Sequence, residues 1–111
     1  MKIFKTITSF FKPISPEDFL VKEIQPSSLT EVLIEERNEF FGKSTDGRSK
    51  EEMEKLLSEE PWKAFLSKLT KEDTLWFYKF PDKYWQKLMG RQGYIITKNG
   101  KAVAHITTYG N

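Results

Sequence analysis

The chain contains no cysteine and has a single histidine, His105, among its 111 residues. The lack of cysteine excludes disulfide bonds, thiolate metal ligands and cysteine nucleophiles. One histidine cannot supply a metal site that is built from several imidazoles. No apolar run approaches the roughly 18 residues of a membrane-spanning helix. We therefore expect no metal, no cofactor and no transmembrane segment, and we expect the chain to be cytoplasmic.

Sequence motifs that mark common catalytic chemistry are also missing. Phosphate loops of the type G-x-x-x-x-G-K-[ST], the fingerprint G-x-G-x-x-G and the zinc motif H-E-x-x-H do not occur. Residues 90–93 match G-x-x-G but lack the helical context of a KH domain. No serine or acid is identifiably placed to complete a triad with His105. The pattern favours a protein that is not an enzyme.

Large aromatic residues are abundant, with nine Phe, four Tyr and three Trp, or 14% of the chain. That content is too high for a disordered segment. A chain of this length suits one domain and buries about 65% of the surface that its unfolded form exposes. We therefore expect residues 1–111 to form one domain.

Charge is unevenly distributed along the chain. Residues 1–16 carry +3 and residues 83–111 carry +5, and neither segment contains an acid. Residues 17–82 hold ten basic and sixteen acidic residues, a net charge of −6. One interpretation is that these segments attract one another within the fold. The other is that the basic C-terminal segment offers a face to an acidic partner or to phosphates.

The first 70 residues show helical patterns. Residues 1–14 have apolar residues at helical spacing with lysines between them, which predicts an amphipathic segment. Such a segment docks on its own core or lies on a membrane surface, and we expect the former. Residues 15–70 are acidic and predict helices. One short helix begins at Ser15 and ends before Pro26, and a capping box at residues 28–31 starts a longer helix that ends near Phe41.

The last third of the chain predicts strands. Residues 75–80 are rich in strand-forming aromatics, and a short helix or turn follows to residue 89. Asn99-Gly100 favours a two-residue hairpin turn, because both central residues of a type I′ turn need positive φ. The expected fold class is α+β, with N-terminal helices packed on a small antiparallel sheet of about three strands that ends in a C-terminal hairpin. Residues 74–109 form its basic strand, short helix and hairpin unit.

A two-residue turn fixes the register of this hairpin. Lys98 is then opposite Lys101, and Tyr94 is opposite His105. The two lysines at the tip either keep an exposed loop soluble or bind carboxylates or phosphates. His105 is the group most suited to titrate near neutral pH, so Tyr94 and His105 are the candidates for a catalytic pair.

The segment from Trp85 to Tyr94 has the pattern W-x-x-L-x-G-R-x-G and is followed by a strand, an x-G-K turn, a second strand and a terminal asparagine. A strand with a tryptophan and a link with a proline precede it, at residues 75–76 and 80–81. This arrangement resembles the C-terminal ends of many small uncharacterised bacterial proteins. The resemblance covers about the last third of the chain and implies a bacterial or phage origin and a compact C-terminal unit. It brings no activity and no catalytic residues.

These observations favour a small non-enzymatic bacterial protein of the immunity or inhibitor type, whose partner is a protein. The acidic helices would be its contact surface, because an acidic patch can cover a basic site on a toxin. The alternatives are a nucleic-acid-associated module that uses the basic hairpin, and an enzyme centred on His105. The candidate partner-binding residues are Glu35, Glu36, Glu39, Tyr94, Lys98, Lys101 and His105.

Overall fold

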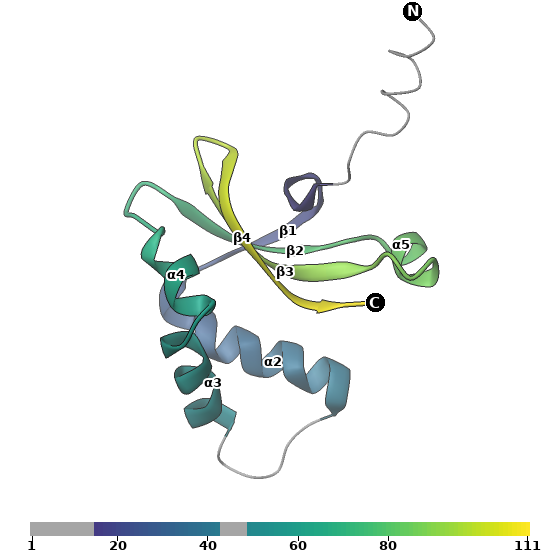
Figure 1. Cartoon of the computed structure of the whole chain (residues 1–111), viewed down its shortest axis with the longest axis horizontal. Helices are drawn as coiled ribbons and strands as arrows, with labels where there is room; N and C mark the ends of the chain where they lie inside the picture. The colour runs from purple at the N-terminus through teal and green to yellow at the C-terminus, as the bar shows by residue number, and fades with distance from the viewer. Residues whose placement is uncertain (1–14, 43–48) are drawn as a thin grey trace, which may run out of the picture.

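The computed structural model describes residues 15–42 and 49–111, and the expectations for residues 1–14 lie outside them. It contains helices and a four-stranded antiparallel sheet in the order β1-β2-β3-β4 (Figure 1). The prediction of an α+β fold is confirmed, and the expected count of about three strands is corrected to four. The strands are β1 (Leu20–Ile24), β2 (Thr74–Lys79), β3 (Arg91–Lys98) and β4 (Lys101–Gly110).

The strand that the sequence did not predict is β1. A 3-10 turn, η1 (Pro16–Phe19), does begin after Ser15, but it ends after four residues and the chain continues as a strand. β1 pairs with β2, and Ile24 lies opposite Leu75. Four of its five residues are exposed, so it has no strong apolar alternation. Pairing with β2 satisfies its backbone and overrides the local helix signal.

Among the described residues, four helical segments lie between β1 and β2 in the chain. They are η2 (Pro26–Ser28), α2 (Leu29–Phe41), α3 (Ser49–Ser58) and α4 (Trp62–Ser67). The predicted end of α2 is confirmed, because Gly42 has φ of 79° and its N–H donates to the carbonyl of Asn38 at 2.9 Å. The predicted capping box is not formed, since the Ser28 side chain makes no capping hydrogen bond.

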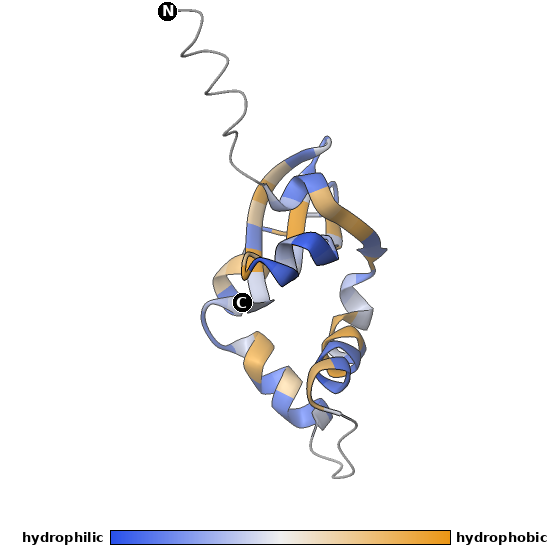
Figure 2. Ribbon diagram, turned by 90° about the vertical axis from the view of Figure 1, so that its right-hand side faces the viewer, coloured by the Kyte–Doolittle hydropathy of each residue, from blue (hydrophilic) through white to orange (hydrophobic). Residues whose placement is uncertain are grey.

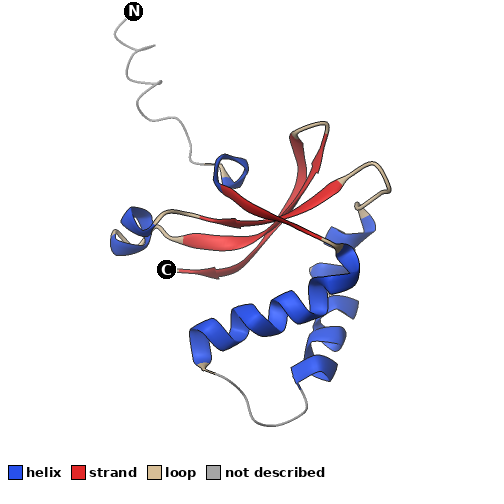
Figure 3. Cartoon of the chain, turned by 180° about the vertical axis from the view of Figure 1, so that it is seen from behind, coloured by secondary structure: helices blue, strands red, loops and turns tan. Residues whose placement is uncertain are grey.

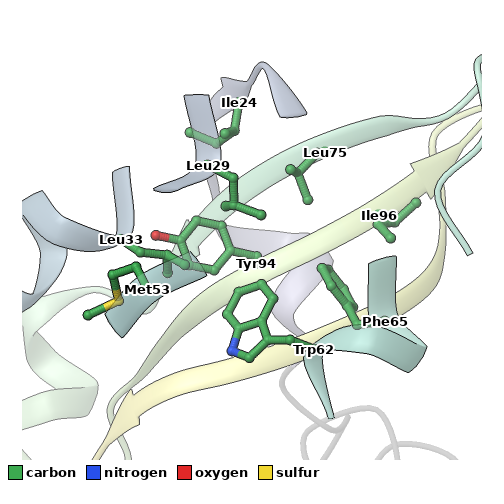
Figure 4. Close-up of a cluster of buried hydrophobic side chains, with 9 residues drawn as sticks. All are labelled: Ile24, Leu29, Leu33, Met53, Trp62, Phe65, Leu75, Tyr94 and Ile96. Carbon is green, nitrogen blue, oxygen red and sulfur yellow. The ribbon is translucent and has the colours of Figure 1, made fainter. Parts of the chain in front are cut away.

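The main core lies between the sheet and α2, α3 and α4, which cover one of its faces (Figure 3). Hydrophobic and hydrophilic residues alternate along these helices, as in helices that bury one side (Figure 2). The ring of Tyr94 lies near the centre of this core, between Leu33 and Trp62 (Figure 4). The buried residues of the core are Ile24, Leu29, Leu33, Met53, Trp62, Phe65, Leu75, Tyr94 and Ile96.

The opposite face of the sheet carries a smaller cluster under η1 and α5 (Asp82–Gln86). Its buried members are Tyr78, Phe80 and Ile95. The indole N–H of Trp85 donates to the carbonyl of Phe80 at 2.9 Å. A Cβ at Gly90 would lie 2.1 Å from the Trp85 ring, so no larger residue fits there. This contact explains why Trp85 and Gly90 occur together in the W-x-x-L-x-G segment.

The register of the C-terminal hairpin is correct at its tip and wrong beyond it. Lys98 pairs with Lys101 as predicted, but the pairing shifts by one residue between Ile96 and Thr97. An extra residue in one strand is a β-bulge, and it exchanges the faces of the residues that follow, here as far as a second shift between Gln92 and Gly93. Tyr94 is therefore opposite Ile106, and His105 is opposite Ile95. The predicted Tyr94–His105 pair does not form.

Candidate functional site

One side of α2 carries a row of exposed glutamates. Glu31, Glu35 and Glu39 are spaced four residues apart, so they follow one another along the same side of the helix. All three side chains are exposed. We call them the acidic row. Two of the predicted partner-binding residues, Glu35 and Glu39, belong to it.

The acidic row ends at exposed aromatic rings. Phe41 is 73% exposed and Phe40 is 42% exposed. The Phe40 ring stacks on Tyr109 of β4, with ring centroids 4.1 Å apart and planes 7° apart. Phe41 also contacts Tyr109, with centroids 5.9 Å apart. We call Phe40, Phe41 and Tyr109 the aromatic end. Large aromatic surface beside acidic groups is thus open to solvent.

Glu36 has a different position from its neighbours, because it faces the sheet and is 5% exposed. Its carboxylate accepts three hydrogen bonds from neutral donors. Tyr94 Oη donates to Oε1 at 3.2 Å, while Gln92 Nε2 and Thr108 Oγ1 donate to Oε2 at 2.7 and 2.6 Å. These four residues form the Glu36 cluster, which joins α2 to β3 and β4.

Burial controls the protonation of this cluster. Burial of the Glu36 carboxyl raises its pKa, and the hydrogen bonds from Thr108, Gln92 and Tyr94 oppose that rise. Burial also raises the pKa of Tyr94 far above its usual range, and the nearby Glu36 charge raises it further. Tyr94 therefore stays a hydroxyl and a hydrogen-bond donor at every ordinary pH.

The structure thus brings two predicted site residues, Glu36 and Tyr94, together, but it places them inside the protein. Glu36 is 5% exposed and Tyr94 is fully buried, so neither lies on the surface of the protein in this conformation. The sequence does contain the signal for Glu36. Leu29, Leu33 and Glu36 follow the helical period of a buried stripe, whereas Glu35 does not.

A cleft of about 290 Å³ lies beside the Glu36 cluster. Leu33, Met53 and Trp62 line it from the helices, and Ile106 lines it from β4. Glu36 forms part of its wall. No basic residue lines it within the part of the chain that the structure describes. A second hollow, shared by Glu35, Glu36 and Glu39, has about 50 Å³ and holds no more than one or two waters.

The other predicted site residues lie elsewhere. Lys98 and Lys101 are exposed at the hairpin tip, where the ammonium of Lys98 is 3.9 Å from a carboxylate oxygen of Glu72. Tyr94 is buried, so it does not form an exposed group with the two lysines. His105 is exposed on β4 and lines a separate hollow with Phe65 and other residues of α4.

The described residues, 15–42 and 49–111, contain neither a grouped set of metal ligands nor a membrane-spanning helix. Within these ranges, there is no group of at least three histidine, aspartate or glutamate residues that could hold a metal ion. The helices in the same ranges are too short or too polar to cross a bilayer. Comparisons with protein-family models, curated proteins and solved structures found no match.

Proposed function

We propose that this protein works by binding another protein through the acidic row and the aromatic end, as immunity and inhibitor proteins do. The observation that carries the proposal is the 73% exposure of Phe41 beside Phe40 and a row of exposed glutamates. Exposing so much aromatic surface to water is unfavourable, and such surface marks interaction sites when it is grouped.

The two parts of this surface suit two stages of association. Carboxylates that are exposed contribute little to stability, but they attract a basic partner and raise its rate of association. Aromatic rings are enriched at the centres of interfaces, where they slow dissociation. The partner that fits is a protein with a basic surface that surrounds an apolar pocket.

The aromatic end is built to keep its shape before a partner arrives. Phe40 is held by stacking on Tyr109 and by Trp85 of α5, at a centroid distance of 6.2 Å. Rings that are already ordered lose less conformational entropy on binding. Support from α2, α5 and β4 therefore favours a binding role for this surface.

Photo-crosslinking in cells of the source organism tests this proposal. The crosslinking amino acid p-benzoylphenylalanine replaces Phe41 in one variant and Val103 in a control. Val103 is a suitable control because it is also apolar, is 44% exposed and lies on β4. We expect one protein to be crosslinked at position 41 and not at position 103. Adding Glu31→Lys, Glu35→Lys and Glu39→Lys should remove that product.

Three results would contradict the proposal. They are the absence of a crosslinked protein at position 41, equal crosslinking at both positions, and a product that persists after the three charge reversals. A product that disappears on nuclease treatment would instead favour the nucleic-acid alternative and its basic hairpin.

A further inference from the structure

The cleft between α2, α3, α4 and β4 combines apolar walls with one buried carboxylate. Its volume of about 290 Å³ is just below the range of ~300–1,000 Å³ for small-molecule sites. Leu33, Trp62 and Ile106 provide apolar surface. Leu56 and Thr107, which also line the cleft, are exposed, so it can be reached from solvent.

The carboxylate of Glu36 retains acceptor capacity. A carboxylate offers about four acceptor positions, and three are occupied here. Oε1 accepts only the bond from Tyr94, so one position on this oxygen is open.

Gln92 is a second residue whose side chain is oriented toward Glu36 as an acceptor. Gln92 is 1% exposed, and its amide Nε2 donates to Glu36. Its Oε1 atom is buried and has no hydrogen-bond partner. The amide of Gln92 therefore donates to Glu36 while its own oxygen stays without a partner, so Glu36 is the acceptor in this contact. All three donors to that carboxylate are neutral, so they leave its charge uncompensated.

The ligand that completes such a site is a cation with an apolar body. We propose that the cleft binds a small organic ammonium ion, whose N–H groups donate to Glu36 and whose apolar part lies against Leu33, Trp62 and Ile106. An anionic ligand would be repelled, because no basic residue of the described chain lines the cleft. This proposal does not rest on the proposed protein partner, because the ligand contacts Glu36 and the apolar wall of the cleft; the two sites meet at Tyr109, which lines the cleft and also belongs to the aromatic end.

The test uses 2-phenylethylamine and its neutral analogue 2-phenylethanol with the full-length protein at pH 8, where an alkylamine is still protonated. Nitrogen-15 NMR titration should show saturable shifts at Trp62, Leu33 and Ile106 with the amine. The alcohol has nearly the same shape but no charge, so we expect it to bind at least about tenfold more weakly.

Two matched variants locate the charge that is responsible. Glu36→Gln should weaken amine binding at least about tenfold, because the amide group is neutral. Glu35→Gln makes the same change one residue away on the exposed side and should leave binding unchanged. If Glu36→Gln does not fold, the proposal is tested by the ratio of the amine affinity to the alcohol affinity in the wild-type protein.

The proposal is overturned if the amine causes no saturable shifts at these residues. It is also overturned if amine and alcohol bind equally, or if Glu35→Gln weakens binding as much as Glu36→Gln does. The last result would mean that the amine responds only to the general negative charge of α2.

Discussion

Glu35 and Glu36 are neighbours on α2, yet one is exposed to water and the other is 5% exposed against the sheet. A helix turns by about 100° per residue, so adjacent side chains point in different directions. The same carboxyl group therefore has two different roles. On the outer side it adds to the electrostatic field around the protein. On the inner side it joins α2 to β3 and β4 through three hydrogen bonds.

The difference in exposure between Glu35 and Glu36 shows that the acidic residues of segment 17–82 do not form one continuous surface. Exposed carboxylates contribute little to folding because water already solvates them. A buried carboxylate without its donors is costly, and so are donors without their acceptor. Substitutions on the two sides of α2 should therefore separate stability from binding.

The largest effect is expected for Glu36→Lys. This change buries an unpaired ammonium and leaves three donors without their acceptor, so it should lower the free energy of unfolding by at least ~3 kcal/mol. Glu35→Lys should change it by no more than about 0.5 kcal/mol. Urea denaturation measures both values. Similar losses for the two variants would show that the sides of α2 do not differ as described.

A smaller loss is expected when a donor is removed from the Glu36 cluster. Thr108→Val deletes the 2.6 Å hydrogen bond to a buried carboxylate and should cost about 1–3 kcal/mol. Thr107→Val is the matched change on the other face, where the Thr107 and Tyr78 hydroxyls are 2.7 Å apart. It should cost about 0.5–1.5 kcal/mol, because both of these groups are neutral. Urea denaturation measures both values. A larger loss of unfolding free energy for Thr107→Val than for Thr108→Val would contradict the claim that the Glu36 cluster stabilises the fold.

The dependence of stability on pH should differ between wild type and Glu36→Gln. The pKa of Glu36 is raised in the folded state from the ordinary value of 4.5. As pH rises above that value, the unfolded chain loses this proton before the folded chain does. Wild-type stability should therefore fall relative to Glu36→Gln until the pH passes the raised pKa. Below pH 4.5, the difference between the two proteins should be constant.

Urea denaturation from pH 4 to 8 measures this difference. The groups that raise or lower the pKa of Glu36 include one other carboxylate, Glu39 on the same helix. Tyr94 and Tyr109, which face Glu36 from the sheet, are neutral in this range because burial raises their pKa values. Glu39→Gln is therefore the control. Its free energy of unfolding should change with pH almost as much as that of the wild-type protein does. Parallel curves for wild type and Glu36→Gln would refute the prediction.

The smallest effect on stability is expected at the aromatic end. Phe41 is 73% exposed, so Phe41→Ala should change the free energy of unfolding by no more than about 0.5 kcal/mol. Its effect on affinity for the crosslinked partner should be at least about tenfold, as for an aromatic interface anchor. Calorimetric titration with that partner measures the affinity. Unchanged affinity would remove Phe41 from the interface.

The sequence predicts correctly those elements that are determined by residues adjacent in the chain, such as helix ends and tight turns. The end of α2 at Phe41 and the turn at Asn99-Gly100 were predictable, because Gly42 and Gly100 adopt the positive φ values that these positions require. β1 was not predictable in the same way, since its pairing partner β2 lies about 50 residues further along the chain. The bulge between Ile96 and Thr97 has no marker in the turn sequence, so the Tyr94–His105 pairing was predicted wrongly.

The candidate site was predictable only in part. The sequence predicts the acidic residues of α2 as a group, and the helical period separates the buried Glu36 from the exposed Glu35 within that group. The aromatic end was missed because Phe40 and Tyr109 are distant in sequence and meet only through the fold. The donors of the Glu36 cluster come from β3 and β4, whose register depends on two irregularities that the sequence does not reveal.

The rate of association with the crosslinked partner tests the central claim most directly, namely that the outer side of α2 is a binding surface. Stopped-flow measurements would compare wild type with the variant that combines Glu31→Lys, Glu35→Lys and Glu39→Lys, at low and high salt. We predict that the variant associates at least about tenfold more slowly than wild type at low salt, and that high salt reduces the difference between the two association rates. Equal association rates at both salt concentrations would contradict the claim.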